Sequence, residues 1–197
     1  MKNSLFNLNY PLQSLCWPKQ NKLIKNVLLV LTGVFVLALA SQLTIPLKPV
    51  PITFQSATVL LIALVYGARL GGATIASYLL AGACGLPVFA EMSSGLHVLL
   101  FNPTSGYLFG FFFATLLTGF LTQYGWGKNI ISAFTAAVLG AVVIFALGIL
   151  FLAHYIGWHQ ATLLGLQPFL ITEPIKLVAV AVIAPRFWKQ PVDADGN

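Results

Sequence analysis

Two charged residues lie one helical turn apart inside a strongly apolar stretch near the end of the chain. The segment PFLITEPIKLVAVAVIA, residues 168–184, holds Glu173 and Lys176, and a helix would place both side chains on one face. A charged side chain at membrane depth costs about 2.5–3.5 kcal/mol on insertion scales, so it usually pairs with another group or marks a functional site. We therefore expect Glu173 and Lys176 to be polar anchors of a ligand site. The alternative is a self-neutralising ion pair near the membrane surface, with Lys176 extended towards water.

The composition places this pair in a membrane protein. The chain has 197 residues, of which 58% are hydrophobic and only 7% are charged, whereas a soluble domain carries roughly 25% charged residues. The formal net charge of +6 could indicate nucleic-acid binding. However, the basic residues are scattered between apolar runs and do not form the clustered patch that such binding needs. We expect an all-α integral membrane protein without a nucleic-acid partner.

Six continuous apolar segments predict six transmembrane helices. Each approaches the roughly 20 residues that a spanning helix needs, and none alternates in the manner of a membrane β-strand. The segments are 27–45, 54–68, 70–90, 107–125, 130–153 and 163–185. Pro174 suggests that the sixth helix begins near it, because proline is best tolerated in the first turn.

The distribution of Lys and Arg predicts the orientation. With the N-terminus inside, the inner segments hold Lys2, Lys19, Lys22, Lys25, Arg69, Lys128, Arg186 and Lys189. The outer loops hold Lys48 alone, which is a strong positive-inside bias. We expect a cytoplasmic segment at 1–26, a six-helix membrane domain at 27–185 and a cytoplasmic tail at 186–197. The protein would then be a multi-pass protein of the cytoplasmic membrane.

Two outer connections are unusual and suggest a pocket between them. The first, IPLKPVPITFQ at 45–55, contains three prolines and should be stiff and extended. The second, at 85–107, is long and half apolar, so we expect it to fold back into the protein, where its backbone would line a cavity. Together with Glu173 and Lys176 near the outer end of the sixth helix, these loops indicate one outward-facing pocket.

The remaining residues argue against an enzyme. No pair of the three histidines has the spacing of a helical zinc site, although His97 could line the pocket. No nucleophile–base constellation and no Walker A motif is present, so neither a catalytic site nor an ATPase is expected, and no metal or cofactor is implied. Tyr107 follows NPTSG where the chain re-enters the membrane, and its hydroxyl would need a partner if buried.

The motifs PVPITFQ, YGARLGG, GLPVFA, PTSGYL and PFLITEPIK occur here in that order. In this combination, over roughly residues 33–185, the chain resembles the BioY family, the biotin-binding S components of energy-coupling factor (ECF) transporters. The resemblance implies a six-helix S-component bundle with a substrate cavity near the outer face. It also implies biotin uptake, usually with a membrane scaffold subunit and two cytoplasmic ATPases as partners.

The resemblance also suggests which residues contact biotin. The family carries Asp and Lys three apart in its last helix, and here these positions are Glu173 and Lys176. Ser93 falls where the family can carry an Asn, and Gln55 and Tyr107 keep their positions at the end of PVPITFQ and after NPTSG. The helix-one segment GVFVLALASQLTI has no clean copy of the AxxxA motif that S components tend to use for docking on the scaffold.

The chemistry of these residues suits biotin. Glu173 can accept a ureido N–H, Lys176 can donate to a carbonyl or carboxylate, and Gln55 and Ser93 can do either. Two rival functions remain at this point: an S component for a different small vitamin, and a small-solute channel. A binding screen across vitamins separates the first, and saturable high-affinity binding argues against the second.

Overall fold

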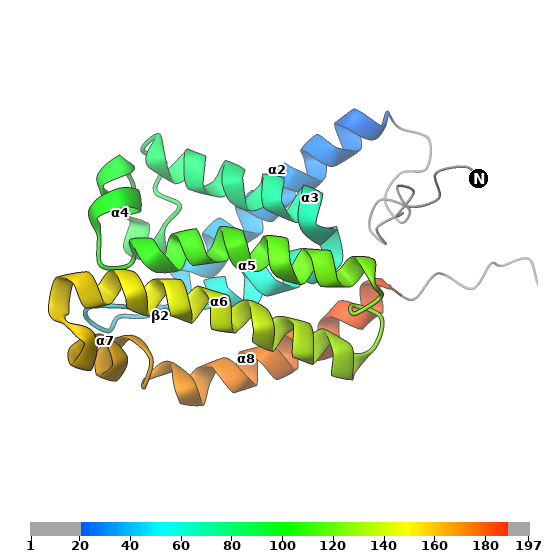
Figure 1. The fold of residues 1–197 in the computed structure, drawn as a ribbon. Helices are drawn as coiled ribbons and strands as arrows, with labels where there is room; N and C mark the ends of the chain where they lie inside the picture. The colour runs from blue at the N-terminus through cyan, green and yellow to red at the C-terminus, as the bar shows by residue number, and fades with distance from the viewer. Residues whose placement is uncertain (1–20, 189–197) are drawn as a thin grey trace, which may run out of the picture.

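The computed structural model describes residues 21–188, which form a bundle of antiparallel helices (Figure 1). A two-stranded antiparallel ladder pairs Thr44 with Thr53 and Ile45 with Ile52 at one end of the bundle. The helices are α2 (Lys22–Gln42), α3 (Gln55–Ala83), α4 (Leu96–Phe101), α5 (Ser105–Gln123), α6 (Ile130–Ile156), α7 (Trp158–Gly165) and α8 (Phe169–Ile183). The strands are β1 (Thr44–Ile45) and β2 (Ile52–Thr53), and the 3-10 turns are η2 (Ala90–Met92) and η3 (Ala184–Phe187).

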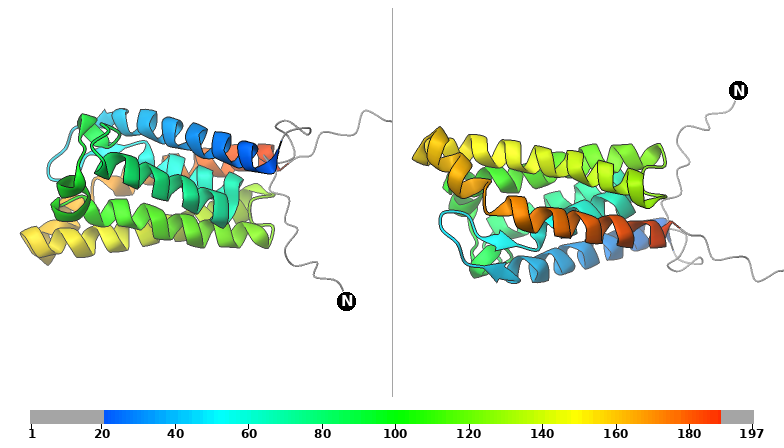
Figure 2. Two further views of the ribbon diagram at one scale, coloured as in Figure 1. Left: turned by 90° about the horizontal axis from the view of Figure 1, so that it is seen from above. Right: turned by 90° about the horizontal axis from the view of Figure 1, so that it is seen from below.

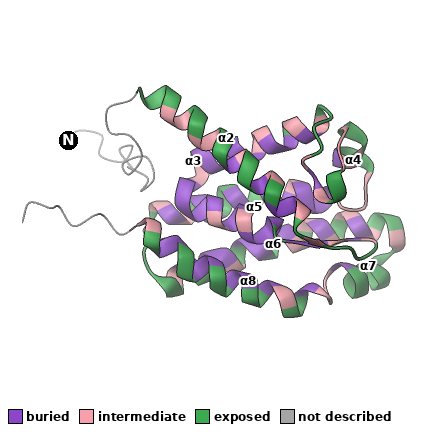
Figure 3. Ribbon diagram, turned by 180° about the vertical axis from the view of Figure 1, so that it is seen from behind, coloured by how far each residue is buried: buried purple, intermediate pink, exposed green. Residues whose placement is uncertain are grey.

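Several of these helices are long and apolar enough to cross a membrane. By length and composition α2, α3, α5 and α6 qualify, and the bent pair formed by α7 with α8 and η3 would make a fifth span. The outer surfaces carry large exposed apolar side chains such as Phe35, Ile131 and Ile175, as lipid contact requires (Figure 3). The prediction of an all-helical, multi-pass membrane protein is confirmed at this level.

Helix α3 contains a sharp reversal at Gly67. This residue has φ 72° and ψ 179°, which is not helical. Residues 63 and 71 would lie about 12 Å apart in a straight helix, yet a Cβ on Gly71 would lie 3.7 Å from the Ala63 Cα. The two halves of α3 therefore lie side by side as a hairpin, and they correspond to the predicted segments 54–68 and 70–90. The second half ends at Ala83, earlier than predicted.

Small residues let other helices pack closely against this hairpin. A Cβ on Gly119 of α5 would collide with the backbone of Gly67 and Ala68, and one on Gly140 of α6 would collide with Leu60 and Thr118. These are the close helix approaches that small residues permit in membrane proteins. The hairpin is thus the centre of the bundle, and its buried residues include most of the first half of α3.

The sixth predicted segment is broken rather than continuous. Residues 163–185 are divided between α7 and α8, which meet at an angle of 48°. The expectation that the helix begins near Pro174 is wrong, since α8 begins at Phe169 and contains Pro174 in its interior. Proline has no backbone N–H, so Pro174 removes one helical hydrogen bond. The missing bond lies next to Glu173, which is buried inside the bundle.

The ends of the described chain lie at the same end of the bundle (Figure 2). There the Trp188 indole donates to the Leu64 carbonyl at 3.1 Å and packs against Gly127. The segments that meet at this end contain Lys22, Lys25, Arg69, Lys128 and Arg186, whereas Lys48 belongs to the opposite end. Lys2, Lys19 and Lys189 lie outside the described residues, as do most of the predicted terminal segments 1–26 and 186–197.

The reversal at Gly67 generates a stability prediction. Gly67→Ala should destabilise the protein by about 1–3 kcal/mol, because φ near 72° with an extended ψ is a region that essentially only glycine occupies. Thermal unfolding of the purified protein in detergent measures the effect. Gly72→Ala is the matched control, since Gly72 lies in the same helix and an added Cβ there meets only the end of the Leu116 side chain. Equal losses in the two variants would contradict the hairpin.

Candidate functional site

A cavity of about 480 Å³ is lined in part by the loop between β1 and β2, and this loop lies at the end of the bundle opposite the described termini (Figure 2). It is walled by the loop before β2, the turn around η2, the residues around the start of α5, and the facing parts of α6 and α8. Its lining residues are Leu47, Lys48, Pro49, Val50, Pro51, Thr53, Gln55, Ser56, Phe89, Ala90, Glu91, Ser93, Val98, Asn102, Pro103, Thr104, Tyr107, Leu108, Phe111, Ile144, Phe145, Phe169 and Glu173.

The walls are mainly apolar, with a few polar groups converging on them. Aromatic rings form one side, where the Phe145 and Phe169 centroids are 5.1 Å apart and the Tyr107 ring lies 5.9 Å from that of Phe145. Volume and lining fit a small-molecule site, which typically measures ~300–1,000 Å³ and combines apolar walls with a few placed polar groups. Both unusual connections predicted from the sequence contribute to the walls.

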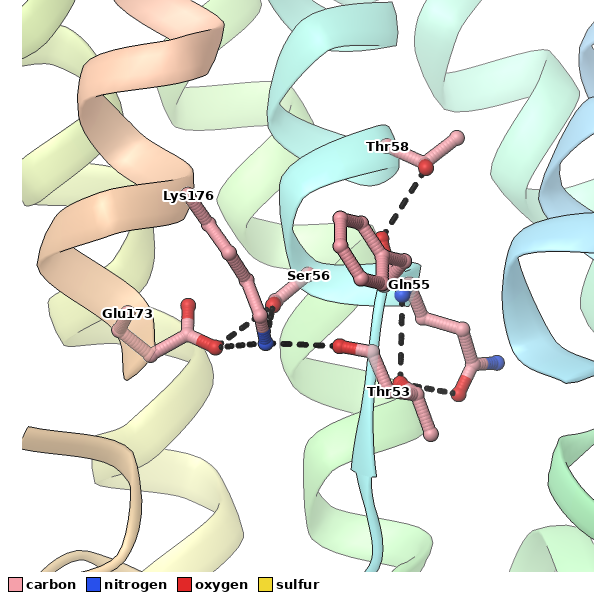
Figure 4. A network of polar contacts seen from close by, with 7 residues as sticks. Thr53, Gln55, Ser56, Thr58, Glu173 and Lys176 are labelled. Atoms are coloured by element: carbon pink, nitrogen blue, oxygen red, sulfur yellow. Dashed lines mark hydrogen bonds and ion pairs between the residues drawn. The ribbon is translucent and has the colours of Figure 1, made fainter. Parts of the chain in front are cut away.

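Glu173 brings a buried carboxylate to the cavity wall. Its Oε1 accepts from Lys176 Nζ at 2.5 Å and from the Ser56 hydroxyl at 3.0 Å (Figure 4). The side chain is only 7% exposed. Its second oxygen, Oε2, is also buried, and within residues 21–188 no hydrogen-bond donor contacts it. One oxygen of this carboxylate is therefore held by the protein, and the other remains able to accept.

Lys176 lies behind this carboxylate rather than on the cavity surface. Its ammonium donates to the Thr53 backbone carbonyl at 2.7 Å and to Glu173, with Ser56 Oγ further away at 3.5 Å. An ammonium has three N–H donors, so protein acceptors surround all of them in this arrangement. Lys176 thus links α8 to β2 and balances the charge of Glu173, which fixes the carboxylate in place.

Gln55 belongs to a chain of hydrogen bonds that runs along the wall. Its Oε1 accepts from the Thr53 hydroxyl at 3.1 Å, and its Nε2 donates to Tyr78 Oη at 2.6 Å. The Tyr78 hydroxyl in turn donates to the Val88 carbonyl at 2.7 Å. The amide of Gln55 therefore connects the loop before α3 with the segment that leads to η2.

Ser93 and Tyr107 also line the cavity, and the hydroxyl of each already donates a hydrogen bond to a backbone carbonyl. Ser93 Oγ donates to the Ala90 carbonyl at 2.7 Å. The Tyr107 hydroxyl donates to the Gly165 carbonyl at 2.8 Å, so it holds the end of α7 while its ring faces the cavity. The expectation that this hydroxyl needs a buried partner is met by Gly165.

The structure thus brings four predicted residues, Gln55, Ser93, Tyr107 and Glu173, to one cavity, with Lys176 directly behind it. His97 is exposed and is not among the lining residues. Sequence reasoning missed Ser56 and the Thr53 carbonyl as partners of the ion pair. The signal was available in part, since Ser56 directly follows PVPITFQ, but a backbone carbonyl has no sequence signature. Among residues 21–188, no group of His, Cys, Asp and Glu side chains could hold a metal ion.

A multi-pass helical bundle with a largely apolar cavity at one end, and a buried acid in the cavity wall, defines a membrane protein that holds a small ligand. The model of the BioY family matches residues 10–192. The chain therefore belongs to the BioY family.

Individual relatives agree with this assignment. The chain is 38% identical over 169 residues to the biotin transporter BioY of Thermotoga maritima, covering 84% of this chain and 98% of the relative. It is 36% identical over 163 residues to the probable biotin transporter BioY of Pyrococcus horikoshii, covering 82% and 95%. It is 32% identical over 189 residues to the probable biotin transporter BioY of Rickettsia prowazekii, covering 94% and 93%.

A solved structure shows the same fold. The structure matches the crystal structure of the S-component for biotin from an ECF-type ABC transporter with a TM-score of 0.79. The match covers 87% of this chain and 95% of the other, at 22% sequence identity. The arrangement of helices is therefore that of an S component.

The contact of Tyr107 with Gly165 generates a second prediction. Tyr107→Phe keeps the ring in the cavity wall but leaves the buried Gly165 carbonyl without its donor, so stability should fall by about 1–3 kcal/mol. Thermal unfolding in detergent measures the loss. Tyr124→Phe is the control, because Tyr124 is 70% exposed and should change stability by less than about 0.5 kcal/mol. A Tyr107→Phe variant as stable as the parent would show that this hydrogen bond contributes nothing.

Proposed function

We propose that this protein captures biotin in the cavity and carries it across the cytoplasmic membrane without transforming it chemically. Membership in the BioY family and the names of its relatives as biotin transporters support the ligand. Volume and lining of the cavity suit a ligand with a polar head and apolar remainder. Biotin has this character, since its ureido ring offers two N–H donors and one carbonyl while the fused ring and valeryl chain are apolar.

The observation that carries the proposal is the unequal engagement of the two Glu173 oxygens. Oε1 of this cavity-lining residue is held by Lys176 and Ser56, whereas Oε2 is buried and contacts no donor in the described part of the chain. A buried acceptor without a partner is unfavourable by about 1–3 kcal/mol, and more when it is charged. A ureido N–H would supply the missing donor through a charge-assisted hydrogen bond.

Lys176 acts in this proposal mainly as a positioning residue. Its contacts with the Thr53 carbonyl and Glu173 keep the carboxylate oriented before the ligand arrives. Pre-orientation of this kind reduces the entropy lost on binding. Gln55, Ser93 and Tyr107 line the same cavity and contribute to its shape, and the Gln55 amide and Ser93 hydroxyl retain acceptor capacity towards a ligand.

The proposed topology has six membrane-crossing segments with both termini in the cytoplasm. The six are α2, the two halves of α3, α5, α6, and α7 with α8. The meeting of the basic segments at the end that holds the described termini supports an inside position for that end. The cavity at the other end then faces outwards. As partners we propose a membrane scaffold subunit and two cytoplasmic ATPases, because the matching solved structure comes from an ECF-type ABC transporter.

The two rival functions are an S component for a different vitamin and a small-solute channel. An S component for a different vitamin would share the fold but would not need an acid with this pairing, so competition by a panel of vitamins against labelled biotin separates the two. A small-solute channel would need a polar path through the bundle. The core instead packs glycines closely against neighbouring helices, as at Gly119 and Gly140.

The ion pair generates the central binding prediction. Glu173→Gln and Lys176→Met should each lower biotin affinity at least tenfold, which corresponds to about 1.4 kcal/mol. The first removes the charge that accepts the ureido N–H, and the second removes the group that holds the carboxylate. Glu173→Asp should be milder because the charge is kept. Titration of biotin against each purified variant measures the affinity.

Folding and binding effects are separated by two controls. Thermal unfolding without ligand shows whether a variant is still folded, since removing one partner of a buried ion pair destabilises by about 3–5 kcal/mol. Thr172→Val is the matched variant, because Thr172 precedes Glu173 but is not among the cavity-lining residues. It should bind biotin like the parent. If Glu173→Gln and Lys176→Met, shown to be folded, also bind like the parent, the pair is structural and the ligand lies elsewhere.

The topology is tested independently of the ligand. A reporter fused after Asn197 should be active only if it is a reporter that functions in the cytoplasm. A second fusion in the loop at Lys48 should show the opposite behaviour. Activity of a periplasmic reporter at the C-terminal end would contradict the six-segment arrangement.

A further inference from the structure

The turn Phe89–Ser93 forms one wall of the cavity and has an unusual backbone. Four of its five residues line the cavity, and the exception is Met92, which is 62% exposed. Glu91 and Met92 have φ values of 56° and 57°, so two consecutive residues with side chains occupy the left-handed region. Such a conformation persists only where surrounding contacts impose it.

Gln42 makes the contacts that span this turn. Its Nε2 donates to the Phe89 carbonyl at 2.9 Å, and its Oε1 accepts from the Met92 backbone N–H at 3.1 Å. One side-chain amide therefore bridges the first and fourth residues of the turn, as a backbone peptide group would. Gln42 is the last residue of α2, so the position of the cavity wall is tied to the end of that helix.

The residues around Gln42 show that this role is particular to it. Ser41 also contacts the segment, with Oγ 2.8 Å from the Val88 carbonyl, but Tyr78 donates to that same carbonyl at 2.7 Å. The loss of Ser41 would leave Val88 bonded. The Phe89 carbonyl and the Met92 N–H have no second side-chain partner among the hydrogen bonds of the described chain.

We infer that Gln42 is a positioning residue, which fixes the strained Phe89–Ser93 turn as a wall of the biotin cavity and thereby slows the dissociation of bound biotin. The inference rests on the proposed function for the identity of the ligand. Without the two Gln42 hydrogen bonds to the turn, Glu91 and Met92 relax to negative φ. The four lining residues of the turn then shift away from their positions in the cavity wall.

The test compares Gln42→Met, which keeps the side-chain length and removes the hydrogen bonds to Phe89, Met92 and the Ser41 hydroxyl, with Ser41→Ala as the control, which removes the last of these and keeps both bonds to the turn. Labelled biotin is bound to the purified full-length protein and chased with excess unlabelled biotin. Dissociation should be roughly tenfold faster from Gln42→Met and within about twofold of the parent from Ser41→Ala. In ligand-free protein, hydrogen exchange of the peptide covering residues 86–95 should also be faster in Gln42→Met.

A second variant separates positioning from a general loss of packing. Met92→Gly added to Gln42→Met should recover part of the lost retention time, because glycine adopts positive φ without strain. A mere packing defect at the end of α2 would not respond to a glycine in the turn. Equal dissociation rates for the single and double variants, or an unchanged rate in Gln42→Met, would overturn the inference. If the parent protein itself binds no biotin while hydrogen exchange of residues 86–95 is still faster in Gln42→Met, the proposed function fails. The role of Gln42 in fixing the turn then still holds.

Discussion

The contact between Lys176, Glu173 and the Thr53 carbonyl is the constraint on which the arrangement of the cavity depends. It joins α8, the last long helix, to β2, which lies more than 100 residues earlier in the chain. Both charges are almost completely buried, so neither can be separated from the other without a large desolvation penalty. The pair therefore links α8 with β2, and it leaves one buried oxygen of the cavity-lining Glu173 without a donor among residues 21–188.

The rest of the fold supplies the setting for this pair. Gly67 turns α3 back on itself, which places Gln55 and Tyr78 within hydrogen-bond distance and carries the Val88 segment to the cavity. The α7–α8 break, held by the Tyr107 hydroxyl, brings Phe169 and Glu173 to the opposite wall. Small residues elsewhere allow close helix packing, so the ligand space lies at one end of the bundle.

Composition and local charge predicted the membrane class, the apolar segments and a pocket beside Glu173, whereas the assignment of Gln55, Ser93 and Tyr107 to the same site was implied by the resemblance to the BioY family. The sequence did not predict that Lys176 faces protein acceptors, since a backbone carbonyl such as that of Thr53 has no signature in residue types. The start of the last helix was wrongly predicted near Pro174, because the preference of proline for the first helical turn is weak when tertiary packing fixes the helix around it. The strained turn at Glu91 and Met92 escaped for a similar reason: the contact that imposes it comes from Gln42, far away in sequence.

The most direct test of the account is an experimentally determined structure of the protein with biotin bound. The account predicts a ureido nitrogen within about 3 Å of Glu173 Oε2, with Lys176 still bonded to the Thr53 carbonyl and the apolar part of biotin against Phe145 and Phe169. A structure in which biotin lies outside the cavity, or in which its ureido group contacts neither oxygen of Glu173, would contradict it.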